Sequence, residues 1–189
     1  TLLLIGSLIF YAWGEGVYVG LLLLSILVNY GCSIILHAYQ RSIYLMAGIT
    51  VNLLILISYK YTSFLTEQLN TLFSLSLPDP ELPLPIGLSF FTFQGISYLV
   101  DVANRRTQPQ THLVRLGLYI AFFPQLIAGP IVRYHHIHNQ LTQRQYNLRD
   151  IRWGIRRFIL GLAKKVIVAD TLAHLVDTIF AVEPSMLTP

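Results

Sequence analysis

Long apolar runs separated by short polar breaks fill the first hundred positions of the chain. Residues 2–13, 17–36, 43–58 and 86–100 contain no charged side chain. A helix of about twenty apolar residues is long enough to cross the hydrocarbon core of a membrane. The pattern therefore predicts an all-α, polytopic helical membrane protein with about four transmembrane helices, of which the first is only the end of a span.

Short polar stretches predict where the chain leaves the membrane. We expect a tight turn at residues 14–16 and a polar loop at residues 37–42. Lys60 lies between two tyrosines, which is typical of an interface anchor, and residues 61–77 are mixed enough to lie at the interface. Four prolines within "LPDPELPLP" (77–85) make this stretch neither helical nor compatible with lipid.

Composition supports the membrane assignment, and charge predicts orientation. Only 12% of the residues are charged, about half the share found in soluble domains. Basic residues near span ends mark the cytoplasmic side, so we place Arg41, Arg105, Arg106 and Arg115 inside and the acidic proline loop outside. No DNA- or RNA-binding motif accompanies the net charge of +4, so we expect no nucleic-acid partner.

Residues 113–132 are apolar and long enough to cross, but they contain helix breakers at Pro124 and at Gly129-Pro130. A crossing would carry Arg133 and the arginines after it to the outside, against the charge bias on both flanks. Re-entry, in which the segment dips in and returns to the same side, avoids this conflict. Non-helical backbone at membrane depth is tolerated only where protein buries it or it lines a water-filled cavity. We favour re-entry, with a kinked full span as the alternative.

Apolar and basic positions recur along residues 151–169 with the period of an amphipathic helix. The apolar positions that share one face are Ile151, Ile155, Phe158, Ile159, Leu162 and Val166. The basic face comprises Arg149, Arg152, Arg156, Arg157 and Lys164. Such a helix is suited to the headgroup plane, with its cations towards anionic lipid. Alternatively, or in addition, its apolar face packs on neighbouring spans.

The histidines at positions 135, 136 and 138 are candidate metal ligands. On a helix only His135 and His138 share a face, no cysteine lies nearby, and the nearest acid is Asp150. A metal site needs three or four convergent ligands. We therefore expect no metal and a solvated or headgroup-facing loop.

Other polar residues in apolar surroundings have simple structural interpretations. His174 has aspartates four positions before and three after it, yet no nucleophile motif accompanies it, so a polar helix face is expected. Asn29 and Asn52 lie inside spans and are expected to form interhelical hydrogen bonds. Asp101 is placed at the end of a span, where its charge costs little.

Three ordered blocks resemble the membrane-bound O-acyltransferase family. They are "LPLPIGLSFFTFQGISYLVDVANRR" (82–106), "FFPQLIAGPIVRY" (122–134) and "FILGLAKKVIVADTLA" (158–173). "FYAW" (10–13) and "KY" (60–61) are similar to the same bacterial branch. That branch includes the alginate O-acetyltransferase membrane subunit and the lipoteichoic-acid D-alanine transfer protein, and the alginate-acetylation type is the more similar.

The resemblance implies a many-helix ring around a thin centre with a tunnel through the membrane. It also implies a catalytic histidine in a later block, so no catalytic residue is assigned to this chain and the chain alone is expected to be inactive. We expect residues 1–189 to be the N-terminal part of a single membrane domain that continues beyond both ends.

The tunnel or re-entrant candidates come from the matched blocks and the breakers. They are Pro85, Gly87, Phe123, Pro124, Gln125, Gly129, Pro130 and Arg133. One departure concerns Gln125, which stands where some relatives place histidine.

The resulting hypothesis is a subunit of an O-acyltransferase in the bacterial inner membrane. By resemblance, it would pass an acyl group, expected to be acetyl, from a cytoplasmic thioester to an extracytoplasmic polysaccharide. The donor would be acetyl-CoA or an acyl-carrier thioester acting as substrate, with no bound cofactor. Expected partners are membrane lipid, an extracytoplasmic acetyltransferase and the polysaccharide. The alternatives are a transporter or flippase, or a scaffold of an export complex; paired midplane charges or an internal repeat would favour the transporter.

Overall fold

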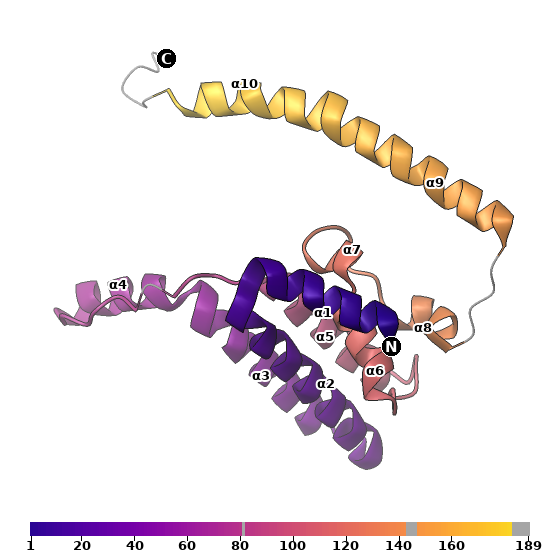
Figure 1. Ribbon diagram of the computed structural model, residues 1–189. Helices are drawn as coiled ribbons and strands as arrows, with labels where there is room; N and C mark the ends of the chain where they lie inside the picture. The colour runs from indigo at the N-terminus through magenta and orange to yellow at the C-terminus, as the bar shows by residue number, and fades with distance from the viewer. Residues whose placement is uncertain (81, 143–146, 183–189) are drawn as a thin grey trace. The chain divides into compact units, whose positions relative to one another are not determined.

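The computed structural model describes residues 1–80, 82–142 and 147–182, and all the regular structure within these ranges is helical (Figure 1). Glu81, an acid of the proline loop, and Arg144, one of the arginines after position 133, lie outside the described residues. The chain divides into two compact units, residues 1–143 and residues 144–189. The all-α fold class is confirmed.

The first unit begins with α1 (Leu2–Glu15), a 3-10 turn (Gly16–Tyr18), α2 (Val19–Tyr39), α3 (Ser42–Lys60) and α4 (Thr62–Phe73). The predicted turn is present but starts later than expected, because residues 14 and 15 still belong to α1. Gly16 has a φ of 53°, which glycine adopts without steric cost.

The length of the helices bears on how many of them can cross a membrane. Among the described residues, the stretches 2–39 and 42–60 are long and apolar enough to do so. The predicted fourth span is α5 (Leu88–Ala103), which has 16 residues and is about 24 Å long, below the roughly 30 Å of a hydrocarbon core. A helical membrane protein agrees with these helices, and the number four stays a prediction.

Helix α5 packs against both α2 and α3, and polar and very small residues take part in this packing. The side chains of Asn29 on α2 and Asn52 on α3 exchange two hydrogen bonds of 3.1 Å and are fully buried. Gly95 of α5 lies against Asn29, and Gly48 of α3 lies against Leu99 of α5. The predicted role of the two asparagines is confirmed. Small residues allow the helices to approach closely, as is common between membrane helices.

The second unit is one helical run with a change of pitch. It comprises α9 (Leu148–Ala163), a π-helical turn (Lys164–Ala169) and α10 (Asp170–Phe180). Asn147 caps the run by accepting a hydrogen bond from the Arg149 amide at 3.0 Å. The π turn brings positions five apart together, so that Lys165 Nζ lies 2.8 Å from Asp170 Oδ2. The predicted single helix over 151–169 is therefore longer than expected and is interrupted at Lys164.

The close approach of α5 to the asparagine pair predicts that Gly95→Ala destabilises the protein. A Cβ at this position would lie 2.4 Å from Asn29 Nδ2, so the pair would have to shift, at a cost of about 1–3 kcal/mol. Thermal unfolding of the detergent-solubilised protein measures the loss.

The matched control is Gly20→Ala on α2, where a Cβ meets nothing within 4 Å. This change should leave the unfolding temperature unchanged or raise it, because alanine is the better helix former. Equal losses for the two variants would contradict the packing described here.

Candidate functional site

The segment that carries the predicted breakers folds back on itself. It contains α6 (Leu113–Ala121) and the one-turn helix α7 (Phe123–Leu126), and after an irregular stretch α8 (Tyr134–Thr142) follows. We call residues 113–133 the folded-back segment. The break lies at Phe122, whose backbone is extended, two residues before Pro124. A proline clashes with the carbonyl four residues earlier, which explains why α6 ends ahead of it and why Pro124 sits in the first turn of α7.

The backbone groups separated by this break have replacement partners. In a continuous helix the Phe123 amide would donate to the Tyr119 carbonyl. Here that carbonyl accepts from Gln94 Nε2 at 2.6 Å and from Gln125 Nε2 at 2.9 Å. The Phe123 amide donates to Ser7 Oγ at 3.3 Å. Three side chains, two of them from α1 and α5, therefore stabilise the break.

The two ends of the folded-back segment meet, and its tip lies at the other end of α5. Gln110 Nε2, just before the segment, donates to the Tyr134 hydroxyl at 2.7 Å. At the tip, the Leu126 carbonyl approaches Gly87 so closely that a Cβ there would lie 2.7 Å from the oxygen. Gly87 also has a φ of 78°, so both sterics and conformation require glycine.

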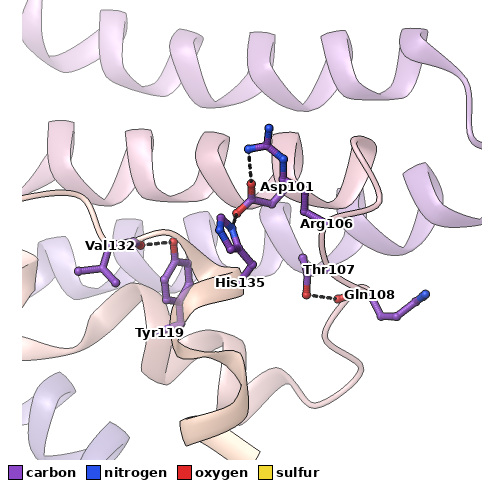
Figure 2. A network of polar contacts seen from close by, with 7 residues as sticks. All are labelled: Asp101, Arg106, Thr107, Gln108, Tyr119, Val132 and His135. Carbon is purple, nitrogen blue, oxygen red and sulfur yellow. Dashed lines mark hydrogen bonds and ion pairs between the residues drawn. The ribbon is translucent and has the colours of Figure 1, made fainter.

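The return path is tied to α6 by an aromatic cluster. The Tyr119 hydroxyl donates to the Val132 carbonyl at 2.8 Å, 13 residues further along the chain (Figure 2). The Tyr119 ring lies 5.1 Å from the Tyr134 ring, and the Tyr134 ring lies 4.9 Å from that of Tyr98, both in edge contacts. All three side chains are fully buried. The segment is thus a packed hairpin rather than a continuous helix.

The candidates for a tunnel or re-entrant lining divide into two groups by burial. Pro85 is buried, and Gly87 and Gln125 are half-buried against the hairpin. The exposed candidates are Phe123, Pro124, Gly129, Pro130 and Arg133. Gly129, with a φ of 121°, provides a second change of direction. That these residues line a tunnel stays a prediction.

A buried carboxylate lies where the hairpin returns. Asp101, in the last turn of α5, is 2% exposed, and its Oδ2 accepts a hydrogen bond from His135 Nδ1 at 2.8 Å (Figure 2). Arg106 Nη1 lies 3.9 Å from the other carboxylate oxygen. This contact fixes the orientation of the His135 ring beside the buried carboxylate.

Two expectations about these residues were wrong. His135 does not lie in a solvated loop: it belongs to α8, and its side chain is 26% exposed. Asp101 does lie near the end of α5, but it is 2% exposed, so its charge is buried rather than of low cost. The two residues are 34 positions apart, so spacing along the chain offered no signal.

His136 and His138 contact other aromatic residues rather than Asp101. His136 stacks on His135 with ring centroids 4.0 Å apart, and His138 Nδ1 lies 3.0 Å from the Tyr134 hydroxyl. Burial raises the pKa of the Tyr134 hydroxyl to about 12, so this hydroxyl stays protonated. Within the described ranges, no three His, Cys, Asp or Glu side chains converge as a metal site would require.

The predicted basic surface lies in the second unit. Arg149, Arg152, Arg156 and Arg157 are exposed on α9, and the Arg156 guanidinium lies 5.6 Å from the centre of the Trp153 ring. Lys164 is exposed as well but begins the π turn. Asp170 pairs with Lys165 rather than with His174.

Comparison with known sequences identifies the family. Residues 105–189, which follow α5 and include the folded-back segment and the second unit, match the model of the membrane-bound O-acyltransferase family. The resemblance to this family, drawn from the three sequence blocks, is confirmed over these residues. No solved structure matches the chain significantly.

Curated relatives extend the similarity to the first half of the chain. A probable alginate O-acetylase of Pseudomonas aeruginosa is 35% identical over 193 positions, covering 96% of this chain and 37% of the relative. A peptidoglycan O-acetyltransferase of Helicobacter pylori is 35% identical over 93% of this chain and 39% of its own length. A teichoic acid D-alanyltransferase of Bacillus subtilis is 30% identical over half of this chain. The chain spans a little over a third of the length of the first two relatives.

The Asp101–His135 contact predicts that His135→Ala destabilises the first unit. The change leaves a buried carboxylate without its closest donor, at a cost of about 1–3 kcal/mol. His135→Asn should recover part of the loss, because its amide nitrogen can donate from nearly the position of Nδ1. Chemical or thermal unfolding in detergent measures both.

His136→Ala is the matched control, since its exposed ring contacts the ring of His135 rather than a buried charge. A His136→Ala loss as large as that of His135→Ala would refute the assigned role of the pair.

Proposed function

We propose that this chain is part of a bacterial membrane O-acyltransferase that acetylates an extracytoplasmic polysaccharide. The observation that carries the proposal is the identity of about 35% along 93–96% of the chain to alginate and peptidoglycan O-acetyltransferases. The family match over residues 105–189 supports the same chemistry. A polysaccharide hydroxyl is the acceptor in this proposal, and the acyl group is acetyl.

The acyl group comes from a cytoplasmic thioester, acetyl-CoA or an acyl-carrier thioester, which is consumed as a substrate rather than held as a cofactor. The acetyl group then passes to the acceptor directly or through an extracytoplasmic acetyltransferase partner. We place the protein in the inner membrane as a multi-pass protein. The exposed basic side chains of α9 face anionic lipid headgroups in this arrangement.

In this proposal the folded-back segment enters the membrane and returns to the same side. Helix α6 has nine residues and is about 14 Å long, too short to cross alone. The contact between Gln110 and Tyr134 supports re-entry, since it joins the two ends of the segment. The Tyr119 carbonyl and the Phe123 amide, which the break at Phe122 separates, both have protein partners, as membrane depth demands.

Site-directed labelling distinguishes re-entry from a full crossing. Single cysteines introduced by Arg115→Cys or His138→Cys, with Cys32→Ala as background, should react with an impermeant thiol reagent from the same side of the membrane. Asp79→Cys in the proline loop should react from the opposite side. Opposite accessibility of positions 115 and 138 would show that the segment crosses.

The activity is tested in cells with the full-length protein that carries this sequence. Deleting its gene should lower the O-acetyl content of an exported polysaccharide, and re-expression should restore it. Restoration should fail with Gly87→Ala, because the added Cβ meets the Leu126 carbonyl at the tip of the hairpin.

Gly154→Ala on α9, where a Cβ meets nothing within 4 Å, is the control and should restore acetylation. The amount of each variant in the membrane is measured alongside. Unchanged acetylation of every exported polymer after gene deletion would refute the proposed function.

A further inference from the structure

A cavity of about 420 Å³, lined by both polar and apolar residues, opens where α2 ends, α3 begins and α5 ends. Its lining includes His37 and Gln40 of the α2 end, Arg41 before α3, and Asn104, Arg105 and Gln108 after α5. These residues all belong to the first unit. The cavity is separate from the contact between Asp101 and His135, neither of which lines it.

The charge of the lining has one sign. Two arginines and a histidine contribute to it, and no aspartate or glutamate does. Among the described residues neither Arg41 nor Arg105 forms an ion pair, whereas the neighbouring Arg106 pairs with Asp101. Two uncompensated guanidinium groups around one cavity attract an anion, and their planar forks match the oxygens of a phosphate group.

On each side of the cavity, one lining residue has an unusual backbone conformation. Gln40 and Arg105 have φ values of 49° and 55°, a left-handed conformation that non-glycine residues adopt at a cost of about 1 kcal/mol each. Arg105 Nη2 donates to Gln40 Oε1, which joins the two strained positions and fixes the guanidinium at the cavity. Its remaining N–H groups can bind a further acceptor.

The surroundings of the cavity are those of a membrane interface. Tyr39, Ile43 and Met46 follow or precede lining residues and are each more than 60% exposed. The rings of Tyr39 and Tyr44 pack 5.2 Å apart, and paired tyrosines are typical of the headgroup level. A ligand with a phosphate and acyl chains would meet the arginines and the apolar rim at once.

We propose that this cavity binds the phosphate of an anionic phospholipid. Arg41 and Arg105 receive the phosphate oxygens, Asn104 and Gln108 bind the polar headgroup, and the acyl chains run along the exposed apolar residues beside the cavity. The arginines recognise a phosphate group, and in this proposal that group belongs to a phospholipid rather than to a free phosphate. The site would hold the ends of α2, α3 and α5 together at one leaflet.

The test titrates the full-length protein, in neutral detergent, with phosphatidylglycerol and counts bound lipids by native mass spectrometry. Parallel titrations use inorganic phosphate and glycerol 3-phosphate. Arg41→Gln and Arg105→Gln should each weaken phosphatidylglycerol binding about tenfold, because each removes charge-assisted hydrogen bonds. Lys60→Gln, which removes a cation at the other end of α3, should change binding less than twofold.

The conservative variants Arg41→Lys and Arg105→Lys keep the charge without the fork and should bind with intermediate affinity, which separates ligand contact from folding. Thermal unfolding confirms that each variant is folded. If Arg41→Gln and Arg105→Gln lose binding of inorganic phosphate but keep binding of phosphatidylglycerol, the lipid is not the ligand of this cavity. Unchanged binding of all three probes in Arg41→Gln and Arg105→Gln would overturn the site.

Discussion

The absent helical hydrogen bond between the Phe123 amide and the Tyr119 carbonyl is the constraint on which the first unit depends. Backbone groups without partners are not tolerated away from water, so the break at Phe122 requires donors and an acceptor from elsewhere. Ser7, Gln94 and Gln125 supply them. Because Ser7 lies on α1 and Gln94 on α5, the break can form only where both helices are already in contact with the hairpin.

Elsewhere in the first unit, hydrogen-bonded polar pairs also connect segments that are distant in sequence. Asn29 and Asn52 join α2 to α3, Gln110 and Tyr134 join the two ends of the hairpin, and His135 joins α8 to α5 through Asp101. Apolar packing alone distinguishes poorly between helices in lipid, so such pairs give the arrangement its specificity.

Local pattern predicted the elements, and it failed at the contact between Asp101 and His135. Charge-free runs and prolines indicated α2, α3, the irregular loop at 77–85 and a break near Pro124. Charge bias placed Arg41 and Arg105 at one end of the bundle, and they line one cavity. The partnership of Asp101 with His135 could not be predicted, because it depends on the path of the hairpin. The shift of the break to Phe122 reflects the clash of a proline with the turn before it.

The Tyr119 carbonyl accepts two hydrogen bonds, and this changes how position 125 is compared among relatives. What the bend needs there is one N–H directed at an oxygen, and glutamine or histidine can each provide it. A histidine at position 125, which the resemblance implies for some relatives, would exchange one such donor for another. A histidine there would then serve the bend of the backbone without any part in catalysis.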